Sequence, residues 1–381
     1  MRKHMTTHYD LAIVGAGFAG LVCARSAALR GLRTLVLERQ PRPGFRIHTT
    51  GLLVKEVAER WEAPPRLTRR IRGVRLYGPS LGSIDLDSPG YYFLATDMPR
   101  LMSWLAREAG RAGAYLRYGS TFQGVTSDGD RIALPGCEAT TRYLIGADGP
   151  HSRVARACAL GRNTEFLVGV EAEVTGLRGL DPDRLHCFLD ARMMPGYIGW
   201  AFIGVGGIAQ VGLACRRPTR PDLDAFMKRL GRVCDIDDAK VVGRRGGLIP
   251  VGGRVEPFGR DNVTLIGDAA GIVSPLTAGG IHTALDSGWR AGHAVADHLL
   301  DGAPTPHLAL HQVFPRFFWK RRLRDLFDLG VPNWLIDAGL KTPPLRAFAR
   351  TVYFHNRGLL SARAWGDLFA GERRNAERKR S

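Results

Sequence analysis

A glycine-rich turn between an apolar strand and a helix constrains the fold of this chain more than any other feature. Residues 9–14 form an apolar run of strand length, and residues 18–30 place apolar side chains three or four positions apart, as on one helix face. The sequence G-A-G-F-A-G at 15–20 lies between them, and residues 32–38 are a second apolar run. This order predicts two parallel strands joined by a right-handed helical crossover.

Each glycine of the turn has its own physical task in such a unit. Gly15 permits the tight turn, Gly17 lets the backbone approach a pyrophosphate, and Gly20 lets the helix pack close to the sheet. The helix N-terminus offers free N–H groups and the positive end of its dipole to the phosphate. Glu38 ends the second strand, where its carboxylate can accept hydrogen bonds from both ribose hydroxyls. The sequence therefore predicts a dinucleotide site.

Two later segments favour FAD over NAD as the dinucleotide. Residues 143–154, Y-L-I-G-A-D-G-P-H-S-R-V, are a strand that runs into an Asp-Gly turn and a basic helix start. Residues 263–271, V-T-L-I-G-D-A-A-G, place Asp268 at the carboxyl end of a strand, where it can accept a bond from a ribityl hydroxyl. The helix expected from Ile281 can direct its N-terminus at the flavin N1/C2=O edge and stabilise negative charge there.

Together the three segments resemble the motif set of FAD-dependent oxidoreductases with the para-hydroxybenzoate hydroxylase fold, over about residues 1–305. The resemblance implies that Arg46 and Arg100 contact FAD and that Phe122 lies on the strand that lines the adenine. The cofactor-binding residues predicted from motif and resemblance are Gly15, Gly17, Phe18, Ala19, Gly20, Glu38, Arg39, Arg46, Arg100, Phe122, Asp148, Gly267, Asp268, Pro275, Gly279, Gly280 and Ile281.

A second resemblance concerns the substrate. Residues 195–202, P-G-Y-I-G-W-A-F, followed by A-Q-V-G-L at 209–213, resemble the geranylgeranyl reductase branch of that family. Tyr197, Trp200 and Phe202 would then form an apolar wall for a polyprenyl tail or an aromatic ring. The alternative is that these three side chains belong to the core of a sheet. His48 and Tyr197 are the candidate catalytic residues, as proton donors.

The predicted fold class is α/β. A Rossmann-like FAD-binding domain, with a parallel sheet and a three-stranded crossover, is expected from residues 1–70, 96–160 and 256–305. A mostly antiparallel substrate domain is expected from 71–95 and 161–255, and a helical basic segment from 306–381. Residues 193–215 carry no charge, but six glycines and a proline favour two strands joined at Gly206-Gly207 over a membrane span. A helix is expected at about 52–61 and strands at 83–94 and 115–125.

Charge and cysteine content bear on partners and location. The net charge is +18, and residues 311–381 hold fifteen Lys/Arg against six Asp/Glu, so half of the excess lies there. Aromatic residues 317–319 beside basic residues 320–322 suit either docking onto an anionic membrane or packing on the protein's own body.

The six scattered cysteines and the absence of a signal-peptide pattern favour a reducing, cytoplasmic location, with peripheral association at the inner membrane face as a further expectation. No metal site and no nucleic-acid partner are expected.

Several reactions stay open at this point. The leading hypothesis is an FAD-dependent oxidoreductase that reduces C=C bonds of an isoprenoid lipid or diphosphate. One alternative is a monooxygenase that hydroxylates an aromatic or polyketide-like substrate with NAD(P)H and O₂. Others are a non-redox flavin-dependent isoprenoid cyclase and a peripheral membrane protein with structural FAD. Because the chain has one dinucleotide motif, NAD(P)H would bind transiently, or a reduced protein would donate the electrons.

Overall fold

The computed structural model describes residues 6–328 and 330–354. Its first large sheet has a parallel centre in the order β18-β11-β1-β2-β8, with β17 at one edge. β10 pairs antiparallel with β11 on one side and with β9 on the other, which confirms the three-stranded crossover. The strands are β1 (Thr7–Val14), β2 (Thr34–Leu37), β8 (Tyr115–Arg117), β9 (Thr126–Asp128), β10 (Arg131–Leu134), β11 (Ala139–Gly146), β17 (Gly259–Arg260) and β18 (Val263–Leu265).

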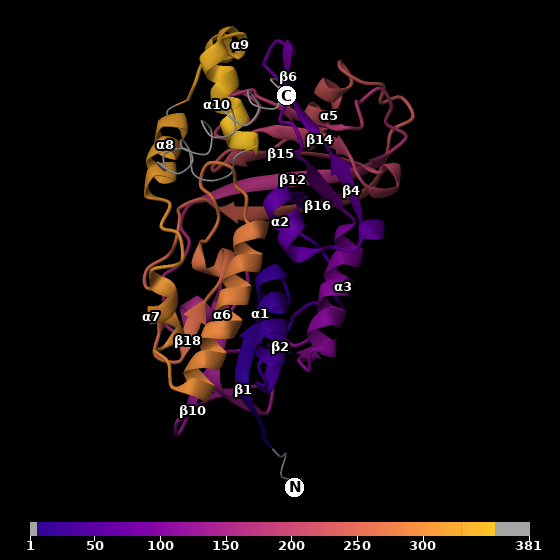
Figure 1. The fold of residues 1–381 in the computed structure, drawn as a ribbon. Coiled ribbons are helices and arrows are strands. Elements are labelled where there is room, and N and C mark those ends of the chain that lie inside the picture. Colours follow the sequence, from indigo (N-terminus) through magenta and orange to yellow (C-terminus); the bar gives the residue numbers. More distant parts are fainter. Residues whose placement is uncertain (1–5, 329, 355–381) are drawn as a thin grey trace, which may run out of the picture.

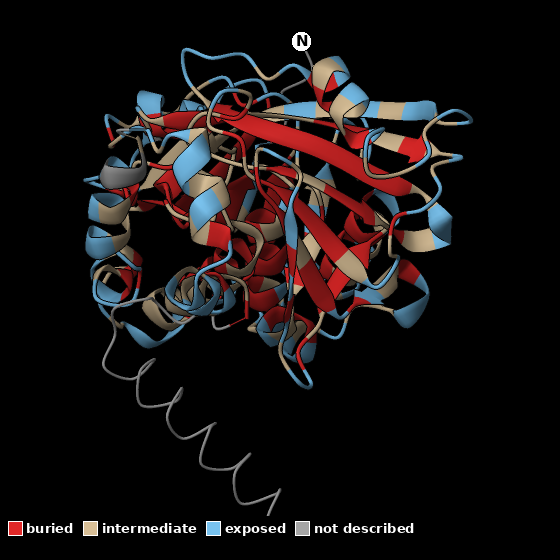
Figure 2. Ribbon diagram, turned by 90° about the horizontal axis from the view of Figure 1, so that it is seen from above, coloured by how far each residue is buried: buried red, intermediate tan, exposed pale blue. Residues whose placement is uncertain are grey.

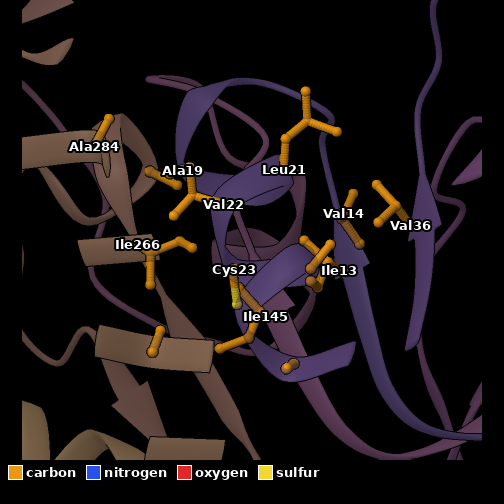
Figure 3. Packing of buried hydrophobic residues seen from close by; sticks show 14 of the residues in the cluster. Ile13, Val14, Ala19, Leu21, Val22, Cys23, Val36, Ile145, Ile266 and Ala284 are labelled. Carbon is orange, nitrogen blue, oxygen red and sulfur yellow. The ribbon is translucent and has the colours of Figure 1, made fainter. Parts of the chain in front are cut away.

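Helices α1 (Phe18–Leu29) and α6 (Ile281–Asp301) pack against each other beside this sheet (Figure 1). In Figure 3, Ala19 and Val22 of α1 lie between strand side chains and Ala284 of α6. The two backbones meet closely because α6 carries glycines at the contact. A Cβ on Gly288 would stand 2.3 Å from the carbonyl oxygen of Ala19, and one on Gly292 would stand 2.7 Å from that of Cys23.

The second large sheet runs in the order β16-β12-β15-β14-β13-β5-β6 and is antiparallel except between β13 and β5. Its central strands β13, β14 and β15 are mostly buried, and Figure 2 shows buried strands in the interior of the molecule, whereas β16 has a single buried residue. Helix α5 packs against β12 and β15. The elements are β5 (Gly73–Tyr77), β6 (Ser83–Asp87), β12 (Phe166–Thr175), β13 (Arg184–Phe188), β14 (Gly199–Ile203), β15 (Ala209–Arg216), β16 (Lys240–Pro250) and α5 (Leu223–Leu230). The predicted hairpin over the uncharged stretch is thus confirmed as β14 and β15.

A small third sheet, β3-β7-β4, was not predicted. Residues 52–61 begin as a strand and not as a helix, because Leu52–Val54 pairs with Phe93–Ala95 before the helix starts at Lys55. The expected strand at 83–94 is divided by a turn in which Gly90 has a φ of +73°. This sheet contains strands from before and after residue 70, where the sequence predicts a boundary between the FAD-binding domain and the substrate domain. The domain boundaries stay a prediction. The elements are β3 (Leu52–Val54), β4 (Thr68–Ile71), β7 (Phe93–Thr96), α2 (Lys55–Trp61), α3 (Met98–Arg111) and α4 (Arg153–Ala157).

The chain after α6 is helical as far as the structure describes it. Helices α8 to α10 lie beside the second large sheet, at the upper left of Figure 1. Prolines stand where the sequence placed breaks, with Pro332 before α9 and Pro343 at the start of α10. Within the described residues, no helix is long and apolar enough to span a bilayer. The helices are α7 (Pro306–His311), α8 (Phe318–Asp328), α9 (Asn333–Leu340) and α10 (Pro343–Phe354).

The glycine contact between α1 and α6 yields a prediction for stability. Gly288→Ala should lower the free energy of unfolding by about 1–3 kcal/mol, because the methyl group would overlap the backbone of Ala19. Gly110→Ala in α3 is the matched control, since its Cβ would meet only Leu116, at 3.7 Å. The control should gain up to ~1 kcal/mol from helix propensity. Urea denaturation measures both, and equal effects of the two substitutions would contradict the packing argument.

Candidate functional site

A large cavity extends from the carboxyl ends of the first sheet's strands to the C-terminal helices. Its volume is about 1420 Å³, more than the roughly 300–1,000 Å³ typical of a single small-ligand site. One part is lined by the glycine-rich turn, residues 147–151 and the start of α6. The rest lies among the second sheet, α9 and α10 and is lined mainly by apolar side chains. The cavity therefore has room for a dinucleotide and a second, apolar ligand.

The glycine-rich turn adopts the predicted geometry. Gly15 has a φ of +105°, and a Cβ there would stand 2.3 Å from the carbonyl oxygen of Ala147. A Cβ on Gly20 would stand 1.9 Å from the carbonyl oxygen of Gly15. Gly17 differs, because a Cβ there would meet nothing within 4 Å. Gly15 and Gly20 thus permit close packing, while Gly17 leaves the backbone open at the cavity wall.

Glu38 supports this turn from the end of β2. Its two carboxylate oxygens accept hydrogen bonds from the backbone N–H groups of Ala16 and Gln40, each at 2.8 Å. The next residue, Arg39, lines the cavity. An anionic side chain bonded to the loop fixes the position at which the ribose hydroxyls were expected to bind.

Asp148 lies in the loop that connects β11 with α4. One carboxylate oxygen accepts the backbone N–H groups of Arg153 at 2.6 Å and Val154 at 3.2 Å, while Oδ1 is buried without a protein partner. Asn163, which the sequence did not single out, donates to the backbone carbonyls of Pro150 at 3.1 Å and Asp268 at 2.8 Å. It ties together the two loops named by the motifs. A lone amide in a loop carries no recognisable pattern, so only the structure reveals it.

Asp268 lies against the start of α6. Its Oδ1 is 3.3 Å from the position that a Cβ on Gly280 would occupy, and its side chain lines the cavity. Burial raises the pKa of this carboxyl to about 6. The N-terminus of α6 has no side-chain cap and also lines the cavity, with Gly279, Gly280 and Ile281. Free N–H groups therefore face the cavity beside a desolvated acid.

The predicted cofactor residues divide into two groups. The cavity wall contains Gly17, Phe18, Ala19, Arg39, Asp148, Asp268, Gly279, Gly280 and Ile281. The wall does not contain Gly15, Gly20, Glu38, Arg46, Arg100, Phe122, Gly267 or Pro275. Of these, Gly15, Gly20 and Glu38 shape the loop from behind. Gly267 packs on α1, since a Cβ there would stand 2.9 Å from the Cβ of Ala19.

Arg46, Arg100 and Phe122 lie outside the cavity wall. Arg46 is exposed, with its guanidinium over the Phe45 ring, and Arg100 is 75% exposed beside Asp97. The strand predicted for Phe122 is wrong, because β8 ends at Arg117 and Gly119 and Gly124 both have positive φ. Phe122 instead lies in a loop and is buried in the core of the first sheet.

The candidate catalytic and substrate residues face the other part of the cavity. Nδ1 of His48 is 2.7 Å from the carbonyl oxygen of Gly246, and because a carbonyl only accepts, Nδ1 carries the proton. The hydroxyl of Tyr197 donates to the carbonyl of Thr277 at 2.6 Å, and burial raises its pKa well above the usual range. Trp200 and Phe202 also line the cavity, on alternate residues of β14.

The residues present fit FAD. The N-terminus of α1 has no side-chain cap, and the open wall at Gly17 lets a pyrophosphate approach its free N–H groups. The orphan Oδ1 of Asp148 and the carboxyl of Asp268 supply acceptors for hydroxyl groups further along. The N-terminus of α6 suits the electron-rich edge of the flavin ring. No group of three or more potential metal ligands occurs among the described residues.

Comparison with known proteins agrees with this reading. The FAD binding domain family matches residues 8–309. A digeranylgeranylglycerophospholipid reductase 2 of Methanopyrus kandleri is 30% identical, over 76% of this chain and 77% of the relative. The chain belongs to the FAD-binding family of these reductases. Another digeranylgeranylglycerophospholipid reductase 2, from Methanothermobacter thermautotrophicus, is 29% identical over 90% of this chain and 91% of its own length.

Solved structures show the fold of this flavoprotein. A geranylgeranyl bacteriochlorophyll reductase-like protein of Thermoplasma acidophilum has a TM-score of 0.76 at 22% identity and covers 92% of this chain and 97% of its own. The myxobacterial chondrochloren halogenase has a TM-score of 0.65 at 19% identity, over 85% and 81% of the two chains. The predicted fold class and the FAD assignment are confirmed, and the protein is an FAD-dependent oxidoreductase, a reductase in preference to a monooxygenase.

The raised pKa of Asp268 yields a prediction for cofactor binding. Hydroxyl donors of FAD favour the ionised carboxylate, so binding should lower this pKa and release a proton. The affinity for FAD should then increase as the pH rises towards about 6, by at most tenfold per pH unit, and level off above it. Fluorescence titration of the apoprotein with FAD measures this. Asp268→Asn should remove the pH dependence, and an unchanged slope in that variant would exclude Asp268 as its source.

Proposed function

We propose that this flavoprotein reduces C=C bonds in the isoprenoid chains of a lipid, most closely a geranylgeranyl-type lipid. The main support for this proposal is the apolar part of the cavity, which lies between the second sheet and helices α9 and α10. It is continuous with the nucleotide part, which is the part lined by the glycine-rich turn, residues 147–151 and the start of α6. The wall of the apolar part includes Leu76, Leu185, Ile336, Phe348 and Val352. A long hydrocarbon chain is the ligand that such a wall accommodates without leaving polar groups unpaired. The names of the relatives support the same substrate class.

When bound, reduced FAD supplies a hydride, and NAD(P)H or a reduced protein supplies its electrons. The protein must then supply a proton for the second carbon of the double bond. We assign that role to His48, because its Nδ1 is held by the carbonyl of Gly246 while the ring lines the cavity. A protonated ring would present its Nε2 proton to a ligand.

Tyr197, the other candidate donor, is better suited to positioning. Its proton is already engaged by the carbonyl of Thr277, and its raised pKa makes ionisation costly. The same bond holds the 275–278 loop, which precedes α6. Arg324 of α8 donates to the carbonyl of Pro275 at 3.3 Å and supports this loop from the other side. Both side chains therefore help to shape the wall near the expected flavin ring.

The proposed reaction predicts a spectroscopic outcome. The purified protein, reduced without O₂ and mixed with a geranylgeranyl lipid, should regain the absorbance band of oxidised flavin, because hydride leaves the flavin for the alkene. The product should be two mass units heavier for each bond reduced. A fully saturated phytanyl lipid is the matched control and should leave the flavin bleached. His48→Gln should slow reoxidation by about 10²–10⁴-fold, the usual contribution of a general acid.

Other outcomes would replace the proposal. Flavin that stays bleached until air is admitted, with an oxygen atom gained by the substrate, would indicate a monooxygenase. A product of unchanged mass, with the flavin still reduced, would indicate a cyclase. A His48→Gln variant that retains the wild-type rate would leave the reductase reading in place and exclude His48 as the donor.

We also propose that the C-terminal helices dock on an anionic membrane. Exposed aromatic rings lie on two of them, with Phe318 and Trp319 on α8 and Trp334 on α9 exposed by 59%, 63% and 70%. Arg322 lies over the Phe318 ring, 5.6 Å from its centroid. Leu335, next to Trp334, is both exposed and part of the cavity wall. An aromatic and basic surface beside a cavity edge suits a protein that takes its substrate from a bilayer.

This proposal predicts a defined binding defect. The double variant Trp319→Ser/Trp334→Ser should bind phosphatidylglycerol vesicles at least about tenfold more weakly, since insertion of apolar surface contributes ~25 cal/mol per Å². Tyr115→Ser is the control, because Tyr115 is 58% exposed on the first sheet, outside the C-terminal helices. Co-sedimentation with vesicles measures both. Equal binding by the two variants, or binding that high salt does not weaken, would reject the membrane role.

A further inference from the structure

One row of residues crosses the cavity face of the second sheet. Backbone pairing aligns Arg245 of β16 with Glu171 of β12, Glu171 with Gly212 of β15, and Gly212 with Trp200 of β14. Arg245, Glu171 and Trp200 all line the cavity. The row thus brings two charged side chains and an indole to a surface that is otherwise suited to hydrocarbon.

The Trp200 indole lies across the central strand of this row. Its Nε1 donates to Oε2 of Glu171 at 2.6 Å, although β15 separates their two strands. The ring reaches that far because residue 212 is glycine. A Cβ there would stand 2.5 Å from Cζ2 and 2.7 Å from Cε2 of the indole. The absence of a side chain at 212 is therefore what permits the bond between Trp200 and Glu171.

The carboxylate that holds the indole belongs to an ionic group with excess negative charge. Glu171 is 3% exposed and pairs with Arg245, which also donates to Glu173 at 3.0 Å. Two carboxylates thus share one guanidinium, so the group carries one formal negative charge. The side chains of Glu171 and Arg245 are 3% and 12% exposed and that of Glu173 is 31% exposed, and burying the first two charges is costly. A structure that serves only to hold a neutral hydrocarbon has no need of it, and a cationic ligand state would benefit from it.

Reduction of an isolated double bond passes through such a state. The π bond breaks, one carbon gains a proton and the other gains a hydride from reduced flavin, so charge and atoms balance. An unactivated alkene accepts hydride poorly until proton transfer has begun, and positive charge then develops on the more substituted carbon. Aromatic rings attract cations through their electron-rich faces, most strongly for indole. A negatively charged acceptor at Nε1 increases the electron density of the ring.

We propose that Trp200, held and polarised by Glu171 and Arg245, stabilises the positive charge that develops on the substrate during reduction. This inference rests on the proposed function and assigns this wall a catalytic task in addition to apolar contact. Trp200 is then a catalytic residue, whereas Glu171, Gly212 and Arg245 are positioning residues that act through it.

The test measures preference for charge at equilibrium and needs no turnover. Two probes are titrated into the oxidised holoenzyme, and binding is followed by the perturbation of the flavin absorbance band. The first is a long-chain dimethylalkylammonium ion, and the second is the branched alkane of the same shape. The wild-type protein should bind the ammonium ion about tenfold or more tightly than the alkane, as expected for a desolvated cation–π contact. The ratio of the two affinities removes the common effect of hydrocarbon burial.

Variants then assign the preference to the row. Trp200→Phe and Glu171→Gln should each reduce the ratio to within about threefold of unity. Phe202→Leu is the matched control, because Phe202 lies on the same face of β14 without the carboxylate bond, and it should weaken both probes alike. If Glu171→Gln fails to fold, the triple variant Glu171→Gln/Glu173→Gln/Arg245→Met removes all three charges of the group and should show the same loss of ratio.

The outcomes separate this proposal from the reductase proposal. A wild-type ratio near unity, or a ratio that Trp200→Phe leaves intact, overturns the charge-stabilising role even if the protein reduces prenyl lipids. An affinity ratio that depends on Trp200 and Glu171 supports the charge-stabilising role. If a geranylgeranyl lipid then fails to reoxidise the flavin, only the proposed geranylgeranyl substrate is rejected. For reduction itself, Trp200→Phe should slow kcat on an isolated alkene about tenfold more than on an alkene conjugated to a carbonyl, which accepts hydride without positive charge.

Discussion

The approach of one backbone to another at Gly15 is the constraint on which the rest of this structure depends. β1 and β11 are neighbouring parallel strands, and the loops that leave their carboxyl ends are in contact, with no room for a side chain at Gly15. This contact places the open N-terminus of α1 beside Asp148. Two more glycines on α6 then bring that helix against α1, which places its own N-terminus at the same cavity. Three backbone contacts thus collect the polar groups of the nucleotide part from segments more than a hundred residues apart.

The other part of the cavity is built by a different principle. Strand alternation directs every second side chain of the second sheet to one face, and helices α9 and α10 supply the opposing wall. Most of the groups on this wall are apolar, so its shape comes from packing and not from hydrogen bonds. The exceptions include His48, Tyr197, Asp190 and the row from Arg245 to Trp200, which have protein partners. Arg324 and Asp328 also line the cavity, and Nη2 of Arg324 and Oδ1 of Asp328 are buried without a hydrogen-bond partner among the described residues. Polar groups thus stand at separate points on a wall that is mainly apolar.

The sequence was sufficient for the features that depend on neighbouring residues. The glycine-rich turn, the acidic end of β2, the Gly-Asp turn after β18 and the hairpin of β14 and β15 all follow from local pattern. Features that depend on register across strands were not accessible in this way. Glu171, Arg245 and Gly212 lie far apart along the chain and meet only because three strands pair in one alignment. Phe122 shows the converse error, because the strand expected at 115–125 ends at Arg117 and glycines with positive φ on both sides of Phe122 turn the chain.

The family match ends at residue 309, whereas the wall opposite the second sheet is built from residues 333–354. The cofactor part and the sheet wall of the cavity therefore lie within the family match, whereas the helices that cover the second ligand are encoded after it. Replacement or drift within the later stretch can alter which hydrocarbon shapes fit while the nucleotide contacts stay intact. A single flavin scaffold can in this way give rise to proteins of differing lipid preference, with its C-terminal helices as the interchangeable part.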